Sequence, residues 1–232
     1  FEELEKTAPS WSSLFHSSEA AFRMNYWGYK KALQFAPKAS YCTKRSRDPV
    51  REYQSMAKAL HQAGIALIQE FFFTQDMQIS YVLEVLRYWK LMFHVDGFHI
   101  TGIPSSREIL ADPLLKGSKM LFSNGCDSPS PQGLGLDYSF MNQLRRFLKG
   151  DEGMLPAIAD YLGAEGKAVH FAADINGFSL ADVFAYNYKH KEDNGEENQD
   201  GESVNYSWNR GAEGETKKKN ILLLRKKMFR NA

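Results

Sequence analysis

The sequence predicts an α/β protein with a parallel sheet, because segments of helical periodicity alternate with short apolar segments along most of the chain. The segment that starts at Asp48-Pro49 places apolar residues at helical spacing and runs into the nearly continuous apolar stretch 65–73. The same order is repeated, with a helix over 82–93 followed by a strand over 95–103. Such helix–strand units build doubly wound sheets and parallel barrels.

Composition limits the classes of function. With 232 residues, 43% hydrophobic and 25% charged, the chain is long enough to bury a core. The formal net charge of +1 gives no global field for nucleic acid or an anionic membrane, and no apolar run has the length of a membrane span. Cys42 and Cys126 match neither a metal-ligand spacing nor a disulfide framework. We therefore predict no metal, no cofactor, no nucleic-acid partner and no membrane partner.

The first helix and strand have clear boundary signals. Asp48 can cap the helix and Pro49 is preorganised for its first turn, while Gly64 stands where a helix stop is expected. The apolar stretch 65–73 then has the pattern of a strand buried on both faces of a parallel sheet.

Further elements follow in order. The second helix is predicted to have one apolar face, formed by Val82, Val85, Leu86, Trp89, Met92 and Phe93. The strand 95–103 follows, and Asp112-Pro113 then begins a short connection to a strand over 119–123. The chain continues with a loop over 124–136 and two helices at about 138–149 and 153–162. A buried strand is predicted over 168–173. The apolar positions of these two helices are Phe140, Leu144, Phe147 and Leu148, then Leu155, Ile158 and Leu162.

The C-terminal part is polar and then basic. Residues 190–201 are almost wholly polar, and their spacing does not match a calcium-binding loop, so we interpret them as a solvated loop. Residues 217–231 predict a basic amphipathic helix whose apolar residues are 221–224 and Met228. The simplest interpretation of its basic residues is a solvated helix face.

Three stretches hold patterns more specific than periodicity. They are Asn25-Tyr26-Trp27-Gly28-Tyr29, the strand Val95-Asp96-Gly97-Phe98-His99-Ile100-Thr101, and the segment 178–214 with its polar loop. Together they resemble isoamylase-type starch and glycogen debranching enzymes of the alpha-amylase superfamily (glycoside hydrolase family 13), from Asn25 over nearly the whole chain.

The resemblance implies a partial (β/α)8 TIM barrel of the alpha-amylase type over residues 1–232. In it, 25–104 is the region of strands 2 to 4, 105–180 is the region of strands 5 to 7, and 181–232 holds the polar loop and basic helix. The N-terminal glucan-binding module, the eighth strand and the C-terminal β domain of the family are not in this chain. Because the first residue is Phe1 and no signal or transit peptide is present, we expect an internal piece of a longer chain.

The family's catalytic positions are replaced here. The fourth family strand reads Val-Asp-Gly-Phe-Arg-Phe-Asp and ends in the nucleophile, but this chain has Thr101 at that position and His99 at the Arg. The acid/base motif Ala-Glu-Pro-Trp-Asp falls on residues 123–127, which places Asn124 at the Glu. A threonine without a general base is not ionised at neutral pH, and an amide does not donate a catalytic proton.

The seventh-strand motif Ala-His-Asp-Gly-Phe falls on residues 174–178, so Asn176 replaces its Asp. Other carboxylates near the expected mouth are Glu70, Asp96, Asp127 and Asp174. Asp96 matches a family residue that is not the nucleophile, and we interpret it as the acceptor of a structural hydrogen bond. Use of Asp174 would require the strand register to shift by one residue, which turns every side chain to the other face.

The resemblance also implies residues that contact glucan. The third-strand motif Asp-x-x-x-Asn-His falls on residues 70–75, so Gln75 stands at the His. The implied substrate-binding residues are Tyr26, Trp27, Tyr29, Gln75, His99 and Asp127. For Trp27 and Tyr29, stacking on sugar and burial in the core both remain open.

Three functional hypotheses follow. A scaffold without catalytic carboxylates resembles the non-catalytic isoamylase subunits of plants and green algae. That resemblance implies a regulatory subunit that binds branched α-glucan and forms a hetero-oligomer with an active isoamylase subunit. The implied compartment is the plastid (chloroplast) stroma if the source is a plant or alga, and otherwise the cytoplasm. The alternatives are an active α-1,6-glucan hydrolase with a displaced site, and a partial gene product without function, whose exposed sheet edges would make it aggregate.

Overall fold

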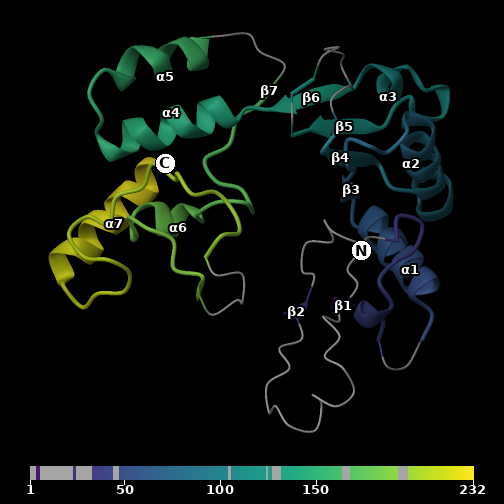
Figure 1. The fold of residues 1–232 in the computed structure, drawn as a ribbon, viewed down its shortest axis with the longest axis horizontal. Helices are drawn as coiled ribbons and strands as arrows, with labels where there is room; N and C mark the ends of the chain where they lie inside the picture. Colours follow the sequence, from purple (N-terminus) through teal and green to yellow (C-terminus); the bar gives the residue numbers. More distant parts are fainter. Residues whose placement is uncertain are drawn as a thin grey trace, which may run out of the picture. The chain divides into compact units, whose positions relative to one another are not determined.

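The computed structural model describes residues 4–5, 23–24, 33–43, 47–103, 106–123, 125–126, 132–163, 168–192 and 198–232. The chain divides into two compact units, Phe1–Gly135 and Leu136–Ala232 (Figure 1). The main sheet has the strand order β3 (Ile68–Phe72), β4 (Gly97–Thr101), β5 (Lys119–Phe122), β6 (Gly133–Leu136) and β7 (Ala168–Val169). The pairings from β3 to β6 are parallel. This confirms the α/β class and is consistent with part of a (β/α)8 barrel.

The first helix forms where its boundary signals predict it. Helix α1 spans Pro49–Gln62, and the Asp48 side chain accepts a hydrogen bond of 3.1 Å from the backbone N–H of Arg51. Gly64 has φ +73°, a conformation that glycine adopts without steric cost and that ends the helical segment.

Strand β3 is buried on one face only, so the prediction of a strand buried on both faces is wrong. Phe71 lies in the core, and Phe73 just past the strand does too, but Ile65 and Ile68 are exposed. The physical reason is that Trp89 of the following helix packs against Phe71 on one face, whereas Ile68 on the other face is 37% exposed.

The core of the first unit is an aromatic cluster between α2 (Ile79–Phe93) and the sheet. Trp89 stacks on Phe93 with ring centroids 4.3 Å apart, and its ring N–H donates to the Gln34 carbonyl at 2.6 Å. Every residue predicted for the inner face of α2 is buried except Met92, which is exposed beside that face. Burial raises the pKa of Tyr53, which packs against this cluster, to about 12.

The segment after β4 contains elements that the sequence did not predict. Helix α3 spans Arg107–Ala111, and the short helix η2 spans Pro113–Leu115. Asp112, at which the predicted connection begins, lies just before η2 and accepts hydrogen bonds from two backbone N–H groups of η2. Strand β6 lies inside the predicted loop 124–136, so that part of the prediction is wrong. A Cβ on Gly133 would lie 2.9 Å from a Leu110 methyl, which explains why a glycine-rich strand fits here.

The second unit is mainly helical in the described residues. Helices α4 (Tyr138–Lys149) and α5 (Met154–Gly163) match their predicted ranges. Of their predicted apolar positions, Phe140, Leu148 and Ile158 are buried and Leu144 is partly buried, but Phe147, Leu155 and Leu162 are exposed. The buried strand predicted over 168–173 is wrong, because β7 has two residues and Ala168 is exposed.

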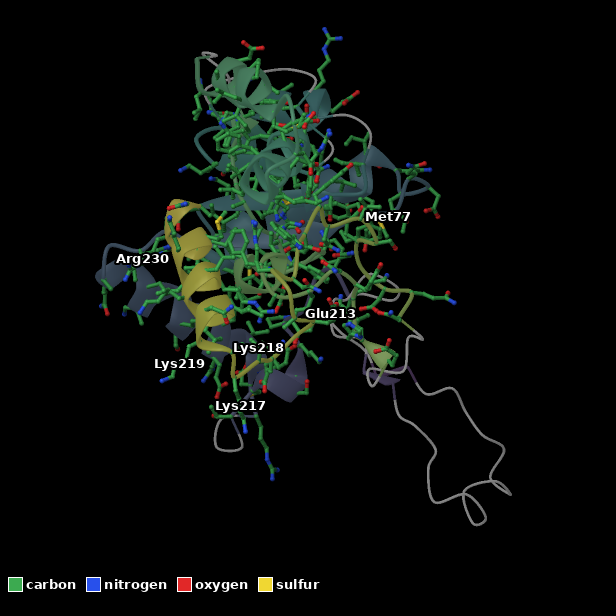
Figure 2. The ribbon with its side chains drawn as sticks, turned by 90° about the vertical axis from the view of Figure 1, so that its left-hand side faces the viewer. Met77, Glu213, Lys217, Lys218, Lys219 and Arg230 are labelled. Atoms are coloured by element: carbon green, nitrogen blue, oxygen red, sulfur yellow. The ribbon has the colours of Figure 1, made fainter. Side chains whose placement is uncertain are left out.

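The last helices pack on a small second core. Helix α6 (Leu180–Val183) and α7 (Lys219–Asn231) bury Val183 and Ile221. Residues 222–224 are exposed, contrary to the predicted apolar face, because α7 contacts the unit along a narrow stripe that includes Ile221 and Met228. Lys217, Lys218 and Lys219 lie at the start of α7 and Arg230 near its far end, as Figure 2 shows.

The remaining described elements are short. Strands β1 (Leu4–Glu5) and β2 (Arg23–Met24) pair antiparallel, and η1 spans Ala39–Tyr41. Within the described ranges, no helix has both the length and the apolar content needed to cross a membrane.

Candidate functional site

The parallel pairing brings the ends of three strands to one edge of the sheet. Glu70 of β3 is the register partner of His99 in β4, and Ser123 follows the last residue of β5. In parallel α/β sheets, functional side chains gather at the carboxyl ends of the strands, so this edge is the candidate site of the first unit.

His99 contacts polar groups from both neighbouring strands. Its Nε2 lies 2.8 Å from the Ser123 hydroxyl oxygen, and its Nδ1 lies 3.6 Å from a carboxylate oxygen of Glu70. The side chains of His99 and Glu70 remain 21% and 35% exposed, so solvent reaches both. Sequence analysis assigned His99 to glucan binding and gave no role to Ser123.

Thr101 stands at the end of β4, where the resemblance places the nucleophile. Its hydroxyl donates a hydrogen bond of 3.2 Å to the Phe71 carbonyl on β3. Gly102 follows with φ +89°, and a Cβ there would lie 1.9 Å from the Phe73 carbonyl oxygen. The Thr101 side chain therefore ties two strand ends together, and it supplies no carboxylate.

Asp96 has the structural role that the sequence analysis gave it. One carboxylate oxygen accepts from the Leu67 backbone N–H at 2.7 Å and lies 2.8 Å from His61 Nε2. Burial alone would raise the pKa of Asp96, but the two hydrogen bonds, together with the positive charges of His61 and Lys90, outweigh it and lower the pKa. Asp96 joins the start of β4 to the segment before β3.

In the second unit, the predicted position Asn176 is exposed. Its amide donates to a carboxylate oxygen of Asp174 at 3.2 Å. Asp174 and Glu202 stabilise the positive charge of the nearby Arg145, whereas burial of Arg145 lowers its pKa. Asp174 is thus half-buried close to the Arg145 cation.

Arg145 is the buried centre of this region. Its guanidinium donates to the carbonyls of Ala172 at 2.9 Å and Phe178 at 3.2 Å, and to the side-chain oxygen of Asn205 at 3.3 Å. The same Asn205 oxygen accepts from the Phe178 backbone N–H at 2.8 Å. These bonds fix the segment around residues 172–178.

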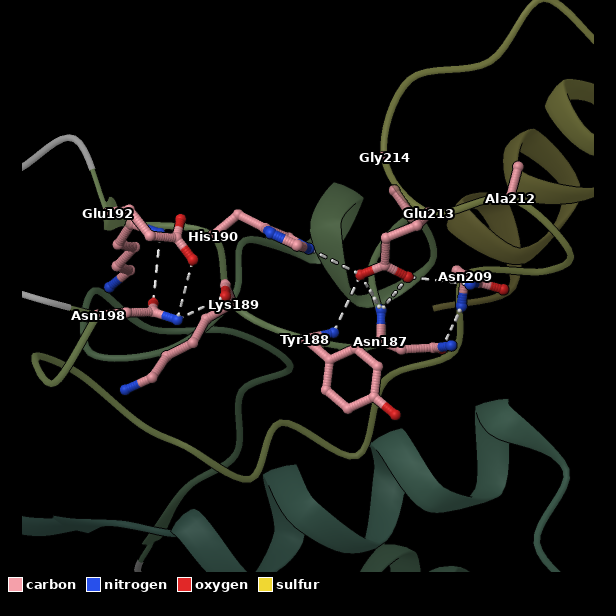
Figure 3. Close-up of polar contacts among 12 residues, drawn as sticks. Asn187, Tyr188, Lys189, His190, Glu192, Asn198, Asn209, Ala212, Glu213 and Gly214 are labelled. Carbon is pink, nitrogen blue, oxygen red and sulfur yellow. Dashed lines mark hydrogen bonds and ion pairs between the residues drawn. The ribbon is translucent and has the colours of Figure 1, made fainter.

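A second polar network joins the polar loop to the segment before α7 (Figure 3). Its centre is Glu213, which contacts the backbone or side chains of Asn187, Tyr188, His190 and Asn209. Next to it lies a cavity of about 200 Å³ whose lining includes Phe178, Tyr186, Tyr188, Lys189 and His190.

The predicted site residues fall partly outside the described part of the chain. Asn124, Asp127, Tyr26, Trp27 and Tyr29 lie outside the described residues, and Gln75 is exposed just after β3. Among the residues whose side chains are described, no cluster of three or more His, Cys, Asp and Glu is arranged to hold a metal ion.

Ser123 is the residue that sequence reasoning missed. The available signal was that Ser replaces the Ala of the acid/base motif while His replaces the Arg of the neighbouring strand. Their contact depends on the β4–β5 register, in which His99 is the partner of Leu121.

Comparison with known proteins identifies relatives but no matching family model. The chain is 26% identical over 287 residues to a glycogen operon protein GlgX homolog of Mycobacterium tuberculosis, covering 89% of this chain and 40% of the relative. It is 25% identical over 311 residues to chloroplastic isoamylase 1 of Arabidopsis thaliana, covering 90% and 40%. A glycogen debranching enzyme of Serratia proteamaculans is 26% identical over 280 residues, covering 86% and 42%.

The chain thus spans about 40% of the length of the curated relatives it matches. The aligned lengths exceed the 232 residues of the chain, so the relatives hold internal segments that this chain lacks. The resemblance to isoamylase-type debranching enzymes that the motifs indicated is confirmed.

Proposed function

Starting from this relationship to isoamylases and glycogen debranching enzymes, we propose that the chain binds branched α-glucan and does not hydrolyse it by the paired-carboxylate mechanism. One observation supports this most directly. The end of β4 holds Thr101, whose hydroxyl is bonded to the Phe71 carbonyl, where that mechanism needs a carboxylate.

The mechanism fails without that group. A retaining glycosidase needs one carboxylate as nucleophile and a second as acid/base, about 5 Å apart across the scissile bond. The positions that the resemblance gives to the three carboxylates are occupied by Thr101, Asn124 and Asn176. A hydroxyl and two amides provide neither an ionised nucleophile nor a proton donor of useful pKa.

The proposed organisation is one barrel-type region over residues 1–232. In this proposal, residues 25–104 correspond to the region of barrel strands 2 to 4, and residues 105–180 correspond to the region of strands 5 to 7. Residues 181–232 form the polar loop and the basic helix. The proposed glucan contacts are Tyr26, Trp27, Tyr29, Gln75, His99 and Asp127, since aromatic rings stack on sugar faces and polar side chains bind hydroxyl groups.

A regulatory role follows if binding is retained without hydrolysis. We propose an active isoamylase as the partner subunit, and the plastid stroma as the compartment if the source is a plant or alga, otherwise the cytoplasm. Two chloroplastic isoamylases, from Arabidopsis thaliana and Oryza sativa, are among the relatives, and bacterial proteins are among them as well.

Co-sedimentation with glycogen tests the binding half of the proposal. We expect the protein to pellet with glycogen and to be released by soluble branched dextrin. Gln75→Ala should weaken pelleting, while Lys58→Ala, on the exposed face of α1, serves as the matched control. An active isoamylase serves as the positive control. If this protein stays in the supernatant at glycogen concentrations that pellet the active isoamylase, the binding proposal is rejected.

A further inference from the structure

Glu70 and His99, in the middle of β3 and β4, and Ser123, just after β5, form an ordered chain of polar contacts. The Ser123 hydroxyl oxygen lies 2.8 Å from His99 Nε2, and His99 Nδ1 lies 3.6 Å from a Glu70 carboxylate oxygen. A hydroxyl on one ring nitrogen and a carboxylate at the other is the order of groups found in serine hydrolases.

The carboxylate determines how His99 can act. Because Glu70 faces Nδ1, the tautomer with the proton on Nδ1 is favoured, which leaves the lone pair on Nε2 free to accept from Ser123. A positive charge formed on the ring would then be stabilised by Glu70. The 3.6 Å separation is an ion-pair distance, and catalytic hydrogen bonds are often this long before substrate binds.

Two substitutions relative to the motifs make this arrangement possible. His99 stands where the strand motif has an arginine, which is not a base at neutral pH, and Ser123 stands where the acid/base motif has an alanine, which has no hydroxyl. Both substitutions are needed for the contact, and the β4–β5 register pairs His99 with Leu121, two residues before Ser123 and on the same face of the sheet. These strands therefore carry an imidazole and a hydroxyl at positions where the motifs have an arginine and an alanine.

From this geometry we propose that Ser123, His99 and Glu70 form a nucleophilic site that hydrolyses carboxylic esters of small acyl groups. Ser123 is the nucleophile, His99 the general base and acid, and Glu70 a positioning residue. The activity goes beyond glucan binding and does not depend on it. All three residues are partly exposed, as a site open to substrate requires.

The reaction balances with water as the only co-reactant. The Ser123 oxygen attacks the carbonyl carbon while its proton moves to His99 Nε2. The carbon–oxygen bond to the alcohol breaks, and the alcohol leaves with that proton. Water then attacks the acyl-serine ester, giving up a proton to His99, and the bond to Ser123 breaks to release the carboxylic acid and restore the hydroxyl.

Covalent labelling tests the nucleophile directly. A fluorophosphonate probe should attach to the intact protein at Ser123, located by mass spectrometry of peptides, with loss of fluoride. Ser123→Ala should abolish labelling, and Ser55→Ala, which changes an exposed serine of α1, should leave it unchanged. The proposal is overturned if Ser123 carries no adduct under conditions in which the same probe labels a known serine esterase. It is also overturned if the denatured protein is labelled at Ser123 as strongly as the folded protein.

Hydrolysis of p-nitrophenyl acetate tests the roles of the other two groups. We expect kcat above that of Ser123→Ala by roughly a hundredfold or more, the range that a positioned base supplies. Glu70→Gln should lower kcat with KM unchanged, and Glu70→Asp should restore part of it, while thermal unfolding shows each variant folded. Equal rates for Ser123→Ala and the parent protein would reject the site. Glycogen binding is measured separately, so the two proposals fail independently.

Discussion

The carboxylate of Glu213 accepts two hydrogen bonds, 2.9 and 3.0 Å long, from the backbone N–H of Asn187. It also accepts from the backbone of Tyr188 and the side-chain amide of Asn209, and His190 Nε2 lies 3.1 Å from it (Figure 3). One side chain therefore holds the start of the polar loop against the segment before α7.

Glu213 makes stability depend on pH. Burial alone would raise its pKa, but the hydrogen bonds from Asn187, Asn209 and Tyr188 and the contact with His190 together lower it from 4.5 to about 2. A lowered pKa contributes stability that is complete above 4.5 and is lost as pH falls toward about 2. We expect the urea midpoint of the second unit's unfolding to fall across that interval. Glu213→Gln should remove most of this fall, and Glu215→Gln, at an exposed neighbour, should not.

Arg145 should be far more sensitive than the arginine next to it. Arg145→Lys leaves carbonyls of Ala172 and Phe178 without full partners in a buried site, so we expect a loss of about 2–4 kcal/mol in unfolding free energy. Arg146→Lys changes a partly exposed pair with Asp151 and should cost less than about 1 kcal/mol. Urea unfolding followed by circular dichroism measures both. Equal costs would mean that the Arg145 bonds do not fix residues 172–178.

Gly102 should tolerate no side chain. Its φ of +89° disfavours L-residues, and a Cβ would lie 1.9 Å from the Phe73 carbonyl oxygen, so Gly102→Ala must shift the ends of β3 and β4. We expect a loss of about 2 kcal/mol or more. Gly163→Ala, which meets no atom within 4 Å, should stay within about 1 kcal/mol of the parent protein. Thermal unfolding that shows similar midpoints for both variants would contradict this geometry.

Trp89 anchors the aromatic core. Trp89→Phe removes the hydrogen bond to the Gln34 carbonyl and part of a fully buried ring, so we expect a loss of about 2–4 kcal/mol. Leu91→Ala, at an exposed position of the same helix, should change the unfolding free energy by less than about 1 kcal/mol. Denaturant titration with tryptophan and circular dichroism signals distinguishes the two.

Local signals in the sequence were enough to predict the main elements. Asp48 and Pro49 mark the start of α1 through capping chemistry, and α4 and α5 match their predicted ranges because their apolar positions repeat at helical spacing. Strand β6 escaped prediction because its Gly-Leu-Gly-Leu sequence resembles a loop, and its identity depends on the room left by Leu110.

The site could be predicted only in part. The motifs located His99 in the middle of β4 and Thr101 at its end, because the strand itself is recognisable. The contact between His99 and Ser123 could not be predicted, since it joins residues on two strands whose register is a tertiary property. Burial at the sheet edge likewise depends on neighbours, which is why Ile68 is exposed in an apolar segment.

Release of reducing ends from a branched α-glucan by the purified protein tests the central claim most directly. Without a carboxylate at Thr101, we predict that release stays at the level of the blank, and that Asp174→Asn does not change it. Release clearly above the blank that disappears in Asp174→Asn would contradict the account, because it would show that Asp174 serves a working site.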